Sequence, residues 1–204
     1  MLTYELEAAL ESEGYRAVCG VDEAGRGPLC GPVAAAACIL PTGLVIEGLD
    51  DSKKLSEKKR EQLYAEICEK AIAYCVVLGS VEEINQTDIL STTLHAMRRA
   101  IDGLSVKADF ALIDGNITRD FTLPCRAVVH GDATSPSIAA ASILAKVTRD
   151  RICMELDAAH PEYGIARHKG YGTKAHMDAL REHGPCEIYR TKFIRFLQDD
   201  GAKK

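Results

Sequence analysis

Three apolar, strand-like runs in this chain are followed in the same way, by one or two carboxylates with a glycine within two residues. The runs are expected to form strands at 17–22, 109–113 and 125–129. The carboxylates at their ends are Asp22, Glu23, Asp114 and Asp132. Because α/β folds place their sites at the edge where strand ends meet, we expect these side chains to converge. A turn explains any single Asp-Gly pair, but three such strand ends together favour a metal site.

Asp22 and Glu23 are neighbours in sequence, and neighbouring side chains of a regular strand point to opposite faces. They can serve one site only if the strand ends or bulges here, which Gly25 and Gly27 just after them permit. Arg26 lies between these glycines, and a bare-backbone turn with one arginine suits a phosphate. Taken alone, this segment is explained better by a solvated β-turn.

Four converging carboxylates would repel one another and raise their pKa values, and two divalent ions would remove that repulsion. A ligand set of oxygens, with no histidine or cysteine, favours Mg²⁺ or Mn²⁺ over zinc. None of the eight cysteines forms a Cys-x-x-Cys pair, which also argues against zinc. Two such ions roughly 3.5–4 Å apart are typical of in-line displacement at phosphate.

Strand-like and helix-like segments alternate along the chain, which indicates an α/β layer fold with a mixed sheet of five strands flanked by helices. The expected strands are 17–22, 33–40, 73–79, 109–113 and 125–129. The expected helices are 3–13, 56–71, one continuous helix from Ser80 to about Ile101, 136–159 and 173–183. A chain of 204 residues is long enough for one domain with a substantial core.

The net charge of −5 neither indicates nor excludes a nucleic-acid partner, because the distribution of charge matters more than its sum. Between 165 and 196 basic residues outnumber acidic ones, and we predict that this part forms one wall of a duplex groove. The basic residues are Arg167, Lys169, Lys174, Arg181, Arg190, Lys192 and Arg195, against Asp178, Glu182 and Glu187.

No apolar run reaches the 18 residues of a membrane helix, and the acidic N-terminal residues lack the features of a secretory signal. Several cysteines lie inside apolar runs, as buried reduced thiols do. We therefore expect a cytoplasmic protein with no membrane partner.

Five segments carry a resemblance to a known family: 20–28 (GVDEAGRGP), 51–56 (DSKKLS), 112–116 (LIDGN), 137–150 (SIAAASILAKVTRD) and 168–173 (HKGYGT). With them, the chain resembles the bacterial ribonuclease HII family over nearly its whole length. The resemblance implies a ribonuclease-H-like catalytic domain at 1–160 and a small helical, substrate-binding part of the same domain at 161–204. It also implies a monomer.

The family hydrolyses the RNA strand of RNA–DNA hybrids and cuts 5′ to single ribonucleotides embedded in duplex DNA. It leaves 3′-hydroxyl and 5′-phosphate ends and uses Mn²⁺ or Mg²⁺. By position, the resemblance makes the four carboxylates Asp22, Glu23, Asp114 and Asp132 the catalytic metal ligands. It assigns recognition of the ribose 2′-hydroxyl to Gly25, Arg26 and Gly27, and packing against the following deoxyribose to Tyr171.

Basic and hydroxyl side chains near these motifs are candidates for phosphate contacts, which position a duplex without specifying its sequence. They are Lys53, Lys54, Ser137, Ser142, Lys146 and Arg149. Two departures from the family pattern reduce the positive charge beside Asp132: His130 replaces a common lysine and Thr134 replaces a frequent basic residue. Our hypothesis is that His130 makes substrate binding depend on pH.

Three other functions remain open from the residues alone. Another metal nuclease of the same fold would cleave all-DNA duplexes. A non-catalytic hybrid-binding protein would not need carboxylates that hinder phosphate binding. A metal-dependent phosphatase would leave the Gly-Arg-Gly turn and the basic C-terminal part unexplained.

Overall fold

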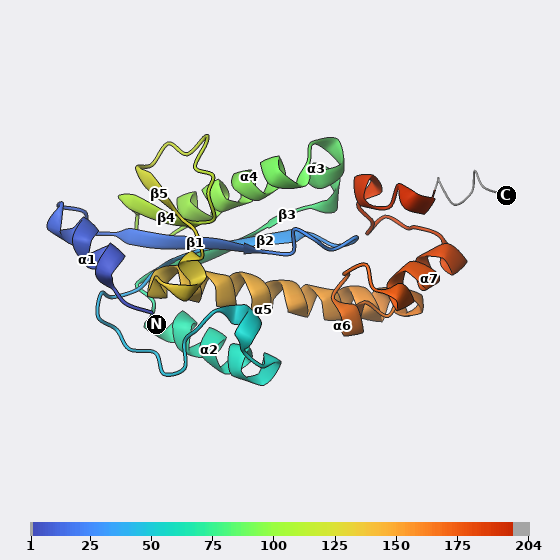
Figure 1. The fold of residues 1–204 in the computed structure, drawn as a ribbon, viewed down its shortest axis with the longest axis horizontal. Coiled ribbons are helices and arrows are strands. Elements are labelled where there is room, and N and C mark those ends of the chain that lie inside the picture. Colours follow the sequence, from blue (N-terminus) through green and yellow to red (C-terminus); the bar gives the residue numbers. More distant parts are fainter. Residues whose placement is uncertain (1, 198–204) are drawn as a thin grey trace.

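A mixed sheet with the strand order β3-β2-β1-β4-β5 runs through the centre of the protein (Figure 1). Residues 2–197 are described by this structure, which is a computed structural model. The strands are β1 (Val18–Ala24), β2 (Val33–Ile39), β3 (Ala73–Gly79), β4 (Phe110–Asp114) and β5 (Cys125–Val128). β1, β2 and β3 pair antiparallel, whereas β4 and β5 run parallel to β1. The predicted α/β fold with a mixed five-stranded sheet is confirmed.

Helices cover both faces of the sheet (Figure 1). They are α1 (Glu5–Ser12), α2 (Glu57–Lys70), α3 (Val81–Gln86), α4 (Ile89–Asp102), α5 (Pro136–Ala159), α6 (Ile165–His168) and α7 (Lys174–His183). α4 packs on one face, and α5 with α2 on the other. Within residues 2–197, none of these helices combines the length and the apolar character that a bilayer span needs.

Small side chains let the helices approach the central strands closely. Along β2, Ala35 and Ala37 join the core beneath α4, while Ala34 and Ala36 join the core beneath α5. At Gly20 of β1, a Cβ atom would lie 2.1–2.4 Å from backbone atoms at the start of α5. This contact is possible only without a side chain, and it seats the N-terminal end of α5 against β1 next to Asp22.

Side-chain caps start the helices where the sequence predicts them. Ser56, Ser135 and Thr173 accept hydrogen bonds from backbone N–H groups of the first turns of α2, α5 and α7. The capping box of Ser80 and Glu83 is present at α3.

The prediction of one continuous helix from Ser80 to Ile101 is wrong. The chain breaks at Thr87, and Asp88 accepts a hydrogen bond from the Ser91 N–H to cap a second helix, α4. Ile72 is 50% exposed because it follows the end of α2 rather than lying on its inner face.

The C-terminal part packs on the far end of α5 through its own small core. Ile165, Leu180 and Tyr189 are buried there with Cys153 of α5 and with Cys30 from the connection between β1 and β2. This contact brings the chain after α7 back to the turn that follows β1. The last seven residues of the predicted 161–204 part, 198–204, lie outside the described residues.

Candidate metal centre and the adjoining turn

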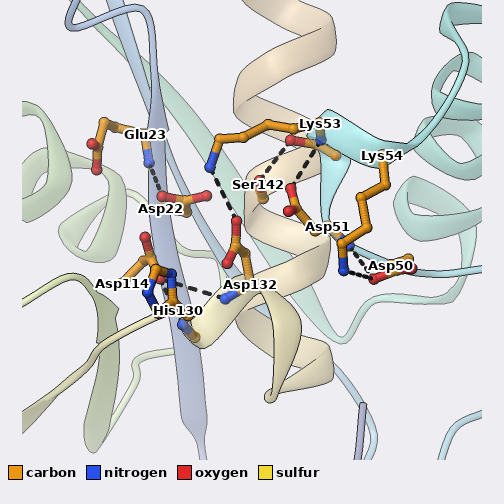
Figure 2. A network of polar contacts seen from close by, with 12 residues as sticks. Asp22, Glu23, Asp50, Asp51, Lys53, Lys54, Asp114, His130, Asp132 and Ser142 are labelled. Carbon is orange, nitrogen blue, oxygen red and sulfur yellow. Dashed lines mark hydrogen bonds and ion pairs between the residues drawn. The ribbon is translucent and has the colours of Figure 1, made fainter. Parts of the chain in front are cut away.

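Asp22 and Glu23 both lie within β1. The end or bulge of the strand that was predicted at these residues is absent. β1 pairs with β2 as far as Ala24, whereas its pairing with β4 ends at Val21. The strand therefore continues on its β2 side alone, and its pleat sends neighbouring side chains to opposite faces. Figure 2 shows the Asp22 carboxylate on the α5 side of β1 and the Glu23 carboxylate turned the other way.

Asp114 is the last residue of β4 and lies one position beyond the end of the β1–β4 ladder, as Asp22 does. The parallel register therefore sets these two carboxylates next to each other on one face. Asp114 Oδ1 accepts hydrogen bonds from the N–H groups of Gly131, at 2.8 Å, and Asp132, at 3.4 Å. These bonds tie the turn that carries Asp132 to the end of β4.

Asp132 lies in the short 3₁₀ turn before α5 and is 4% exposed. Its Oδ2 lies 3.2 Å from the Nζ of Lys53, which reaches in from another 3₁₀ turn (Figure 2). That second turn is held to α5 by the hydrogen bond of 2.9 Å between the hydroxyls of Ser52 and Ser142. Four segments distant in sequence therefore meet at the N-terminal end of α5.

Burial, together with repulsion between neighbours, raises the pKa values of three of these carboxylates. Burial raises the pKa of Asp22 well above its ordinary value, and the charges of Glu23 and Asp114 raise it further. Burial also raises the pKa of Glu23, against the opposing effect of Arg26. The pKa of Asp114 is raised by burial and by Asp132, against the hydrogen bond from Gly131. The folded protein therefore holds these groups in a site short of positive charge.

The donor set fits hard divalent cations. All four side chains offer oxygen only, and the cations that contact them in the described part of the chain are Lys53, at Asp132, and Arg26, at Glu23. Within residues 2–197, a different group of three potential metal ligands brings its ligand atoms within 4.8 Å of one another. This group is His160, Cys186 and Glu187, beyond the far end of α5. The four carboxylates are spaced more widely than this, and Asp22 and Glu23 leave β1 on opposite faces. One ion could be shared by three of them only after side-chain rotation.

The predicted recognition turn lies beside this centre. Gly25 has a φ of +98°, and a Cβ atom there would lie 1.9 Å from Nε of Arg149. The Arg26 guanidinium lies 3.4 Å from Oε1 of Glu23. A Cβ atom on Gly27 would lie 3.4 Å from the ring of Tyr171, which is itself 47% exposed. The structure thus brings the turn, the predicted sugar-packing tyrosine and one carboxylate together.

Three of the residues predicted to contact phosphates have buried side chains in this structure. Ser137 is 0% exposed where α5 meets β1, and Ser142 is bonded to Ser52. Arg149 is 1% exposed and donates to backbone carbonyls. They are buried because α5 is enclosed by β1, β2, α2 and the C-terminal part.

The lysines are placed differently from one another. Lys53 points into the carboxylate centre, whereas Lys54 lies 3.1 Å from Asp50 and points away from it (Figure 2). Lys146 lies 2.7 Å from Asp150 of the same helix. His130, exposed and in the left-handed region with a φ of +55°, lies beside Asp114 and leaves the centre without a permanent cation at that position.

Arg190 is buried, whereas the sequence predicts it on the surface. It was counted in the basic wall, but it is 0% exposed and bonded to the recognition turn. The available signal was its place directly after Ile188 and Tyr189, a short apolar run in which a surface arginine is out of place.

Comparison with known proteins gives consistent matches. The family model described as Ribonuclease HII matches residues 19–196. A protein named Ribonuclease HII from Burkholderia vietnamiensis is 58% identical over 176 residues, covering 86% of this chain and 82% of that protein.

Two solved structures have the same fold. The ribonuclease H2 from Pyrococcus horikoshii OT3 superposes with a TM-score of 0.77 at 25% identity, covering 93% of this chain and 100% of that one. The RNase HII of Archaeoglobus fulgidus, solved in a complex with PCNA, gives a TM-score of 0.72 at 26% identity, covering 87% of this chain and 95% of that one.

Proposed function

The chain belongs to the ribonuclease HII family and is an endonuclease that hydrolyses RNA in RNA–DNA hybrids, and on this premise we propose that it also cuts 5′ to single ribonucleotides embedded in duplex DNA. The observation that carries the proposal is the placement of the Gly25–Gly27 turn and Tyr171 beside the four carboxylates. One ribonucleotide can be recognised by this turn while its 5′ phosphate reaches the acidic centre.

Asp22, Glu23, Asp114 and Asp132 are the residues that would hold two Mg²⁺ or Mn²⁺ ions. When bound, such ions activate a water molecule and offset the negative charge that develops on the attacked phosphate. The chain's own contribution is to fix the ligands in place. The Glu23 N–H holds Asp22 Oδ1 at 2.7 Å, and the Gly131 N–H holds Asp114. Cleavage leaves 3′-hydroxyl and 5′-phosphate ends.

Cleavage of matched duplexes tests this function. One duplex contains a single ribonucleotide, the second is all DNA, and the third is an RNA–DNA hybrid, each incubated with Mn²⁺ or Mg²⁺. We expect a cut 5′ to the ribonucleotide and no cut in the all-DNA duplex. Cleavage of the hybrid without cleavage at the single ribonucleotide would contradict the proposal.

Tyr171→Ala should reduce cleavage at a single ribonucleotide more than cleavage of a long hybrid. The aromatic ring lies against Gly27 and is half exposed, so it is free to pack on the sugar that follows the ribonucleotide. Stacking of this kind contributes about 1–3 kcal/mol, and we expect kcat/KM to fall about tenfold or more on the first substrate. Tyr74→Ala, which removes an exposed tyrosine of β3, is the control. Equal losses on both substrates would argue against this role.

We also propose that the protein acts as a monomer in the cytoplasm, on RNA–DNA hybrids and on duplex DNA that contains ribonucleotides. One chain supplies every residue assigned above. All eight cysteines are free thiols, as is usual in a reducing compartment.

A further inference from the structure

The carbonyl groups of the turn after β1 converge on one buried side chain, that of Arg190. This guanidinium donates four hydrogen bonds, all to backbone oxygens. The acceptors are the carbonyls of Gly25 at 2.7 Å, Arg26 at 3.0 Å, Pro28 at 2.9 Å and Gly31 at 2.9 Å. Arg190 is 0% exposed, so water does not compete for these donors.

Arg149 joins the same turn to the loop that carries Tyr171. Its guanidinium donates to the carbonyl of Cys30 at 3.3 Å and to that of Lys169 at 3.0 Å. The turn and this loop also share a direct bond of 2.8 Å from the Leu29 N–H to the Gly170 carbonyl. The two recognition elements are therefore one connected unit.

Neither guanidinium has a carboxylate within 4.0 Å among the described residues. A buried charge without a counter-ion is costly unless hydrogen bonds compensate it. Burial and the nearby charge of Arg149 lower the pKa of Arg190 to about 10. The carbonyls of the turn are thus the groups that stabilise Arg190 in the folded protein.

The inward carbonyls determine where the amide groups point. In a trans peptide the N–H of one residue is opposite the C=O of the residue before it, and the protein contains no cis peptide bond among the described residues. Because the carbonyls of Gly25 and Arg26 face the guanidinium, the N–H groups of Arg26 and Gly27 face away from it. Neither N–H has an acceptor in the described part of the chain. Both residues are exposed, so these N–H groups are donors open to solvent.

We propose that Arg190 is a positioning residue for ribonucleotide recognition: by binding the carbonyls of Gly25 and Arg26 it turns the N–H groups of Arg26 and Gly27 outward to donate to the ribose hydroxyl and its phosphate. The inference rests on the proposed function, because it names the residue from which the selectivity for ribonucleotides arises. Arg190 itself touches no substrate. A lysine would keep the positive charge, but a single ammonium cannot bond four carbonyls spread along the turn.

The test compares wild type with Arg190→Lys in two measurements made with Mn²⁺. One is the KM for a duplex with a single ribonucleotide, and the other is the inhibition constant of an all-DNA duplex competing with it. Their ratio measures ribonucleotide selectivity. We expect the selectivity to be about tenfold lower in the variant, because one or two hydrogen bonds to the ribose become weaker. Arg16→Lys, which changes an exposed arginine in the same way, should keep the ratio.

The outcomes separate the inference from the proposed function. Wild type without selectivity would contradict the proposed function itself. Selective wild type together with an unchanged ratio in Arg190→Lys would overturn the inference. A variant that is partly unfolded lowers kcat through its active fraction but leaves the ratio unchanged, which would also count against the inference.

Amide hydrogen exchange of the wild-type protein gives a second test that needs no variant. In the free protein, the N–H groups of Arg26 and Gly27 should exchange quickly, while that of Leu29, bonded to Gly170, should exchange slowly. With EDTA present to prevent cleavage, the duplex with a ribonucleotide should slow exchange at Arg26 and Gly27 more than the all-DNA duplex. Slow exchange at these two amides in the free protein would overturn the inference.

Discussion

Asp22→Asn should lower kcat/KM by at least ~10³-fold on both the hybrid and the single-ribonucleotide duplex, a loss of about 4 kcal/mol of transition-state stabilisation. The charges of both Glu23 and Asp114 act on Asp22, and an amide at this position removes one of the proposed metal ligands. The fold should persist, since the amide oxygen can still accept the Glu23 N–H that bonds Asp22 Oδ1. Cleavage kinetics across a range of Mn²⁺ concentrations measure the effect.

Asp102→Asn, the same chemical change at an exposed position at the end of α4, is the matched control and should leave activity unchanged. Wild-type activity in Asp22→Asn at saturating metal would rule out this residue as a ligand. Circular dichroism of both variants shows whether a loss of activity comes from unfolding.

The same substitution should stabilise the metal-free protein at neutral pH. Because the pKa of Asp22 is raised in the folded state, the folded state binds more protons than the unfolded state between the two pKa values. Stability in EDTA therefore falls as pH rises from about 3.9 through the raised pKa of Asp22. Asp22→Asn removes this contribution, and we expect a higher Tm at pH 7, by roughly 2–4 °C for each kcal/mol relieved. A lower Tm than wild type in EDTA would contradict this explanation.

Gly25→Ala should destabilise the protein and also abolish selectivity for ribonucleotides. A methyl group at Gly25 meets Nε of Arg149 at 1.9 Å, and the φ of +98° is unfavourable for any residue with a Cβ. Strain and overlap together cost roughly 2–4 kcal/mol. Arg149 must then move and release the carbonyls of Cys30 and Lys169, which hold the turn against the tyrosine loop.

Gly43→Ala separates the two causes. Gly43 has a φ of +86°, but a Cβ atom there meets nothing within 4 Å. This variant should carry only the backbone strain, about 1 kcal/mol, and should keep wild-type selectivity. Thermal unfolding in EDTA and the cleavage ratio between single-ribonucleotide and all-DNA duplexes measure both effects. Equal losses of Tm in the two variants would show that Arg149 moves aside without a loss of stability.

Much of the local structure could be predicted because its causes lie within a few residues. The caps at Ser56, Ser80, Ser135 and Thr173 need only a side chain and an N–H three residues later. The strand positions follow from apolar runs. The break before α4 was missed since the apolar stripe continues across it, whereas Asp88 competes locally for the first turn of a new helix.

The carboxylates could be named from the sequence, but their arrangement could not. The prediction that β1 ends at Asp22 rested on the following glycines. In the structure β2 continues to pair with β1 as far as Ala24, and this pairing keeps Asp22 and Glu23 on opposite faces. Register between strands is a property of two segments, so it cannot be derived from one.

By itself, the sequence determined the α/β class, the family and the four acidic side chains, because periodicity and motif chemistry are properties of the chain. Only the tertiary structure decided which polar residues face the substrate. Arginine is a residue type that commonly binds phosphate, yet Arg149 and Arg190 are buried and donate hydrogen bonds to carbonyls of the turn. Burial depends on the elements that pack around a residue, and for these arginines the bonded carbonyls of the turn lie more than 100 residues away along the chain.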